Sequence, residues 1–222
     1  MRVRISYPLN RKSPLYPGTP PVSIEAFRSI GRGDSANSCI ITLPGHAGTH
    51  IDLPRHFCSS GGTAVDLLGA ETTVEPVYCI DLPKPRGDSI TPGDLRHLGV
   101  PGDARGLLVR TGFFRYRSSD PEIYTREHPW VHPGVVGILR EKLPALILFG
   151  VDTISISNPV QRNMGHEAHR SFLCEKPPIM LLEDLDLSQE NLSRYPWKLT
   201  IYPLFLDELD GVPVIVFLEQ SL

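Results

Sequence analysis

The chain has 222 residues, a formal net charge of −3 and 41% hydrophobic residues. This length and apolar content suit one compact domain with a core of its own, so we expect a single domain over residues 1–222. The charge gives no basic patch for a nucleic-acid partner, and no apolar run approaches the roughly 20 residues that span a membrane.

Short strands dominate the predicted elements. The chain contains 22 prolines and 19 glycines, which favours many short connections over long helices. Several apolar runs are continuous, which predicts strands buried on both faces. The predicted strands, in chain order, are Arg2–Tyr7, Ser38–Leu43, Val74–Asp81, Gly106–Thr111, Ala145–Gly150, Ile179–Glu183, Leu199–Leu206 and Val212–Leu218.

Helices are fewer. Residues 91–98 begin with Thr91 as a predicted N-cap and Pro92 at the first helical position. Residues 132–143 carry regularly spaced apolar side chains and end before a proline, and residues 165–174 form a third, short candidate. Together these elements predict a mixed α/β domain rich in strands.

The run from His46 to His56 holds three histidines and one aspartate within a short stretch of chain. Imidazole nitrogen and carboxylate oxygen are ligands of zinc, manganese and iron. In an extended chain His46, His50 and Asp52 point to one side, whereas a helix would separate Asp52 from the histidines. A glycine and a proline within the run disfavour a helix, so we place it on a strand end that enters a loop. His56 is then either a further ligand or a free imidazole beside the metal.

Other interpretations of this run are weaker. Isolated histidines are usually surface or core residues, but four possible ligands at regular spacing favour a metal site. Structural zinc sites recruit cysteines and fill every position, whereas a His/carboxylate set leaves a position for water, which favours catalysis. The chain has no Gly-x-Ser-x-Gly elbow, and Gly61-Gly62 lacks the residues of a phosphate-binding loop.

The motif His46-x-Gly48-Thr49-His50-x-Asp52-x-Pro54-x-His56 resembles the signature of the metal-dependent cyclase superfamily, which includes kynurenine formamidase and isatin hydrolase. The resemblance extends over nearly the whole chain, through residues 15–20, 108–112, 150–153, 168–173 and 182–185. It implies a swivelling β/β/α fold and assembly as a homodimer or homotetramer.

The resemblance also implies a site. It assigns as ligands of one or two divalent ions, Zn²⁺ or Mn²⁺, the residues His46, His50, Asp52, His169 and Glu183. It makes His56 the catalytic acid/base. The stretch between the two distal ligands is longer than is typical of the family, which leaves His166 and Glu175 as competing candidates.

The implied function is hydrolysis of an amide or lactone bond in a small, aromatic substrate, an arylformamidase-like activity of tryptophan catabolism. Metal-activated water attacks the carbonyl carbon while a histidine exchanges protons. Two alternatives stay open: a family member that binds metal or ligand without turnover, and a lactam or lactone hydrolase or cyclase of other metabolism. Residues 15–20 lack the tryptophan of kynurenine formamidases, which leaves the substrate open. Five aromatic residues are expected either to line a pocket, in this chain or in a partner subunit, or to pack in the core or an interface: Phe113, Phe114, Tyr116, Tyr124 and Trp130.

The four cysteines, Cys39, Cys58, Cys79 and Cys174, lie far apart and form no CxxC pair. We therefore expect no disulfide framework, and each cysteine as a small buried hydrophobe. The N-terminus begins like a strand and lacks the apolar segment of a signal peptide. These features predict a cytoplasmic protein.

Overall fold

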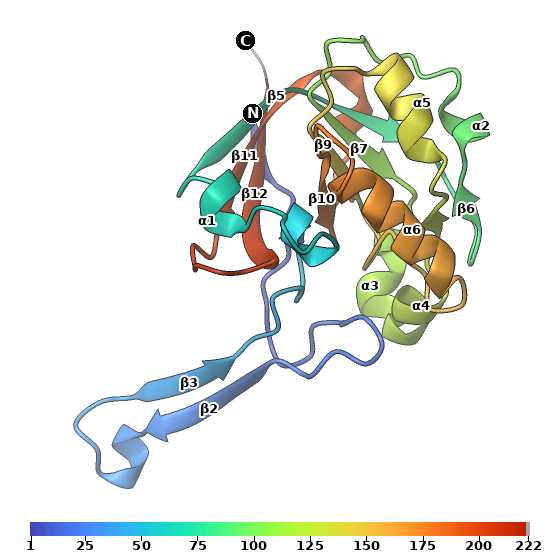
Figure 1. Ribbon diagram of the computed structural model, residues 1–222. Coiled ribbons are helices and arrows are strands. Elements are labelled where there is room, and N and C mark those ends of the chain that lie inside the picture. Colours follow the sequence, from blue (N-terminus) through green and yellow to red (C-terminus); the bar gives the residue numbers. More distant parts are fainter. Residues whose placement is uncertain (221–222) are drawn as a thin grey trace.

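The computed structural model describes residues 1–220. Eight strands form one sheet in the order β1-β12-β11-β5-β7-β9-β10-β4, and a further pairing of β12 with β4 closes all of them except β1 into a ring (Figure 1). The bounds are β1 Arg2–Arg4, β4 His50–Asp52, β5 Thr72–Asp81, β7 Gly106–Arg110, β9 Leu148–Val151, β10 Met180–Glu183, β11 Trp197–Pro203 and β12 Gly211–Gln220. Two smaller sheets pair β2 (Ser23–Arg28) with β3 (Ser38–Thr42) and β6 (Ser89–Ile90) with β8 (Trp130–Val131).

Strands β5, β7, β9 and β10 run parallel and are covered by helices. In β7, Leu107 and Val109 face outward into a core shared with α5 (Val135–Lys142) and α6 (Arg162–Leu173), whereas Leu108 faces the core inside the ring. Figure 1 shows both helices on the same side of β7 and β9. Both faces of these strands are therefore buried, as their continuous apolar sequence predicts.

The eight predicted strands all overlap strands of the structure, with ends displaced by a few residues. The sequence missed β2, β6 and β8, and the short helices α1 (Ala64–Leu67), α3 (Tyr116–Ser119) and α4 (Pro121–Arg126). The three helices and the two-residue strands are too short to show a periodic pattern, and β2 has no buried residue whose apolar spacing could indicate a strand. Single 3₁₀ turns occur at η1 (Ile30–Arg32), η2 (Pro54–His56), η3 (Phe113–Arg115) and η4 (Leu192–Arg194).

The first predicted helix is α2 (Pro92–Leu95), shorter than expected. Thr91 is its N-cap: the Thr91 hydroxyl accepts from the Asp94 N–H, and the Thr91 N–H donates to the Asp94 carboxylate at 2.7 Å. This capping box satisfies the free donors at the helix start, as the sequence predicts. None of the helices among residues 1–220 has the length and apolar character to span a membrane.

The expectation about the cysteines is wrong for three of the four. Cys58 and Cys174 form a disulfide across 116 residues of sequence, with a Cα–Cα distance of 5.7 Å, and Cys39 is exposed. Only Cys79 is a buried free thiol, as expected for each of them. The disulfide joins the segment after η2 to the end of α6, because tertiary packing brings these segments together. No local spacing could indicate such a pair.

Candidate metal centre

Five segments meet on the outer face of the ring beside α6. The extended strand β4 directs His50 and Asp52 to this face, while Ile51 between them is fully buried in the core inside the ring. Pairing of β10 with β4 sets Glu183 opposite His50, and α6 supplies His169. His46 lies in the turn before β4, and His56 lies at the end of η2. The alternation predicted for His46, His50 and Asp52 is present for the last two, whereas His46 lies in a turn outside the strand.

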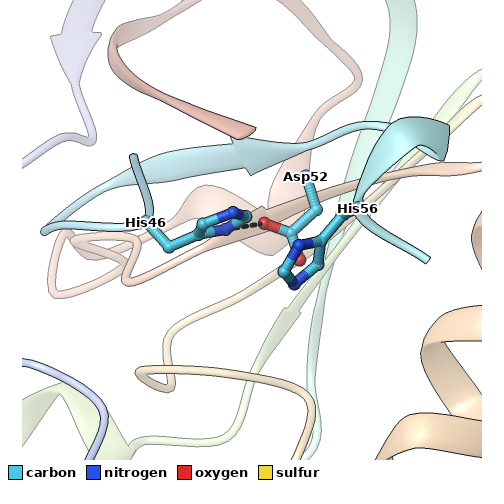
Figure 2. Close-up of side chains that lie close together, drawn as sticks. All are labelled: His46, Asp52 and His56. Atoms are coloured by element: carbon cyan, nitrogen blue, oxygen red, sulfur yellow. Dashed lines mark hydrogen bonds and ion pairs between the residues drawn. The ribbon is translucent and has the colours of Figure 1, made fainter. Parts of the chain in front are cut away.

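The Asp52 carboxylate is the centre of the cluster. Its Oδ1 lies 2.8 Å from His46 Nδ1 and 3.2 Å from His50 Nε2, and its Oδ2 lies 3.5 Å from His169 Nε2. Glu183 lies 3.4 Å from His50 Nε2 and 3.6 Å from His169 Nε2. Figure 2 shows the rings of His46 and His56 next to this carboxylate. All five residues that the family resemblance assigns as ligands therefore converge.

Two backbone carbonyls orient the buried imidazoles. His50 Nδ1 donates to the Gly48 carbonyl at 2.8 Å, and His169 Nδ1 donates to the Gly165 carbonyl at the same distance. Each ring thereby turns Nε2 toward the carboxylates. Such second hydrogen bonds fix the tautomer of histidines that bind metals.

The cluster attracts positive charge. Burial works against the charged form of His46, but the Asp52 charge and hydrogen bonds to Asp210 and Asp52 raise its pKa to about 9. Burial also opposes the charged form of His169, yet hydrogen bonds to Asp52 and Glu183 raise its pKa to about 10. Burial and the Asp52 charge oppose ionisation of Glu183, but hydrogen bonds from His169 and His50 hold its pKa down at about 2.

These residues fit a divalent cation. Asp52 and Glu183 are 1% and 2% exposed, and neither forms an ion pair with a lysine or arginine within residues 1–220. Buried carboxylates require a positive partner, and nitrogen and oxygen donors in this mixture suit zinc or manganese. Two groups of ligand atoms, His46-Asp52-His56 and His50-Asp52-Glu183, lie close enough to hold an ion. Asp52 belongs to both groups.

One carboxylate in the site was missed by the sequence reasoning. Asp210, in the turn before β12, lies 2.7 Å from His56 Nδ1 and 3.1 Å from His46 Nε2. Asp210 lies 154 residues after His56, so no local sequence pattern links the two residues. The signal available was its place directly before the apolar strand that starts at Gly211, a common position for a side chain at a site.

The two competing distal candidates differ in their placement. Glu175 pairs with Arg140 at 3.4 Å and contributes no atom to the cluster. His166 is an exposed residue that lines the cavity above the cluster, and its ring lies tilted beside that of Phe57, with centroids 5.7 Å apart. Neither therefore takes the place of His169 or Glu183 in this structure.

The cavity above the cluster has a volume of about 230 Å³. Its aromatic walls are Tyr16 and Phe57, joined by Ser155, Ser157 and Arg162. The five aromatic residues proposed from the sequence for this purpose do not line it, and Phe113 and Tyr124 pack instead in a small core of their own. Aromatic side chains carry no local signal that separates core from pocket.

Comparison with known proteins identifies a matching family, similar sequences and similar solved structures. The family model described as "Putative cyclase" matches residues 3–158. Kynurenine formamidase of Bacillus cereus is 31% identical over 212 residues, which cover 96% of this chain and 94% of the relative. The solved structure of isatin hydrolase A from Labrenzia aggregata is similar with a TM-score of 0.73 at 21% identity, over 98% of this chain and 93% of that chain. A "predicted metal-dependent hydrolase from Bacillus stearothermophilus" has a TM-score of 0.76 at 21% identity, over 98% and 97% of the two chains.

Fold, site and relatives together define a metal-dependent hydrolase. The chain belongs to the cyclase family, the family that its sequence motif resembles. The family resemblance and the strand-rich α/β fold class are both confirmed.

Proposed function

We propose that this chain hydrolyses the C–N bond of a small, aromatic amide, as an arylformamidase of tryptophan catabolism. The observation that carries the proposal is the convergence of three histidines on the buried carboxylates of Asp52 and Glu183, under a cavity with aromatic walls. The relatives named kynurenine formamidase support the choice of substrate class.

The proposed ligands of one or two ions, Zn²⁺ or Mn²⁺, are His46, His50, Asp52, His169 and Glu183. Asp52 would be a ligand of either ion, because its carboxylate lies close to His46, His50 and His169. The bound metal supplies a water of lowered pKa and polarises the substrate carbonyl.

His56 is the proposed acid/base. It lines the cavity, and its Nδ1 is held by Asp210, so Nε2 is the ring atom left for proton transfer. In the reaction, water adds to the carbonyl carbon and the C–N bond breaks. His56 takes a proton from the water and returns it to the leaving nitrogen, so it ends in its starting form. The products are a carboxylic acid and an amine.

Hydrolysis of N-formyl-L-kynurenine tests the proposal. The protein is purified, stripped of metal, and assayed with zinc or manganese added back. Turnover that depends on one of these ions supports the arylformamidase proposal and identifies the working ion. An absence of turnover with both ions refutes it, and directs the assay to lactams and lactones, the bonds suggested by the fold similarity to isatin hydrolase.

The second candidate function is metal or ligand binding without turnover. The variant His56→Ala distinguishes it from the proposed hydrolase. We expect this variant to retain its metal content, measured by atomic emission, and to lose turnover. If His56→Ala released the metal, the division between ligands and acid/base would be wrong. If neither the natural chain nor any variant hydrolysed amides, lactams or lactones, the non-catalytic function would be favoured.

A second copy of the chain is the proposed partner, in a homodimer or homotetramer. The hairpin β2–β3 projects away from the ring in Figure 1 and exposes Phe27, Ile40 and Ile41 by 62%, 55% and 60%. A two-stranded hairpin alone is marginally stable in water, and this much apolar surface is typical of an interface. Light scattering of the natural chain and of Phe27→Ser with Ile41→Ser tests this proposal, with a lower mass expected for the double variant.

We also propose that residues 1–222 act as one domain and that the protein works in the cytoplasm. The Cys58–Cys174 pair bears on the second point, because disulfides are rare in reducing compartments. Alkylation of free thiols in intact cells, followed by mass spectrometry, measures the state of the pair. Reduced thiols support the cytoplasm, and an oxidised pair contradicts it.

A further inference from the structure

Asp210 lies in the turn directly before β12, next to the candidate metal site. Gly211, the first residue of β12, pairs with Asp52 of β4, and the Asp210 carbonyl accepts from the Leu53 N–H at 3.0 Å. These backbone bonds hold the turn at the end of the strand that carries Asp52. The position of the Asp210 side chain is therefore set by the sheet and not by a free loop.

One oxygen of this carboxylate contacts two imidazoles. Asp210 Oδ2 lies 2.7 Å from His56 Nδ1 and 3.1 Å from His46 Nε2. The two rings are tilted by 33° to one another, with centroids 4.1 Å apart. For His56 the contact assigns Nδ1 as the donor, since a carboxylate accepts. Among the described residues, His56 Nε2 has no hydrogen-bond partner, and His56 lines the cavity.

The turn also leaves no space for a side chain after Asp210. A Cβ atom on Gly211 would lie 2.2 Å from Cε1 of His46. The glycine thus lets the Asp210 carboxylate and the His46 ring approach on the same side of the strand. Asp207 and Glu208, the other acidic residues of this turn, are exposed, so Asp210 is the one of the three that contacts the histidines.

We propose that Asp210 is a positioning residue, which holds His56 in the orientation and tautomer that present Nε2 to the substrate. This inference rests on the proposed hydrolysis, where His56 carries the proton from water to the leaving nitrogen. The Nδ1 proton stays on His56, hydrogen-bonded to the Asp210 carboxylate, so the proton that moves enters and leaves at Nε2. A carboxylate behind an imidazole sets its tautomer and favours its protonated form during transfer.

Three variants of the metal-loaded protein test the proposal. Asp210→Ala removes the acceptor, Asp210→Glu retains a carboxylate, and Asp207→Ala is the matched control in the same turn. For Asp210→Ala, assayed at saturating metal, we expect kcat to fall about 10- to 100-fold with KM changed less than about threefold. Asp210→Glu should restore part of kcat, and Asp207→Ala should match the natural chain.

A second measurement does not depend on turnover. Nitrogen-15 NMR of the imidazole rings reports which nitrogen of His56 carries the proton. We expect Nδ1–H in the natural chain and in Asp207→Ala, and loss of this single tautomer in Asp210→Ala. If the formamidase proposal fails but the tautomer depends on Asp210, the positioning role stands for another substrate. If excess metal restored the kcat of Asp210→Ala to the natural value, the effect would lie in metal binding through His46 and the proposal would be overturned, and an unchanged tautomer or unchanged kcat would overturn it as well.

Discussion

The Cys58–Cys174 disulfide provides the sharpest test of how the site-bearing segments are held together. Cys58 follows His56 by two residues, and Cys174 lies at the end of α6, which carries His169. The bond closes a loop with a sequence separation of 116 residues. Loop-closure entropy in the unfolded chain then predicts a stabilisation of about 5 kcal/mol at 25 °C.

The perturbation is the double variant Cys58→Ser with Cys174→Ser, compared with the oxidised natural chain. For a protein of this size, about 5 kcal/mol corresponds to a fall in Tm of roughly 10–20 °C. Urea unfolding and thermal melting measure the change, and the natural chain treated with dithiothreitol should behave like the double variant. Cys39→Ser, at an exposed free thiol, is the control.

Equal stability of the oxidised natural chain and the double variant, within about 1 kcal/mol, would refute this reasoning. Equal stability of the natural chain with and without dithiothreitol would do the same, provided that thiol counting shows complete reduction. Loss of stability in Cys39→Ser alone would show that the effect does not come from the closed loop.

Three further predictions concern single positions. Burial lowers the pKa of His128 to about 4, below its unfolded value near 6.5, so stability present above pH 6.5 falls by about 3 kcal/mol as the pH drops toward 4. Urea unfolding at pH 8 and pH 4 should show this loss, and His128→Gln should reduce it. Gly211→Ala should displace the His46 ring and lower the metal content per chain, because its Cβ would lie 2.2 Å from that ring. Arg117→Leu should destabilise the fold by about 3–5 kcal/mol in urea unfolding, because it leaves the fully buried Asp184 carboxylate without its two 2.7 Å bonds.

Each prediction has a matched control. His97→Gln changes an exposed histidine, and should leave the acid limb of the stability curve unchanged. Gly137→Ala adds a methyl group in α5 where no atom lies within 4 Å, and should keep its metal. Arg126→Ala breaks an exposed pair with Glu122 and should change stability by less than about 1 kcal/mol. A control that changed as much as its partner would contradict the reasoning for that position.

The sequence by itself determined the chemistry of the site and most of the strands. The ligand types of the run from His46 to His56 predict a metal site, and the resemblance to the cyclase family supplied the distal ligands. The alternation along β4 is also a local property, because successive side chains of an extended backbone point to opposite faces. Apolar runs such as residues 145–149 also located the buried strands. A continuous apolar run is itself the local signal of a strand that is buried on both faces.

Only the tertiary structure decided which distant residues meet. Closure of the ring through β12 and β4 brings Asp210 to His56 across 154 residues, and packing of η2 against α6 joins Cys58 to Cys174. The same packing separates Glu175 from the cluster and keeps Glu183 in it. These contacts depend on how strands pair and helices pack over the whole chain. Periodicity and spacing report only neighbours within a turn or a strand, so they carry no information about such contacts.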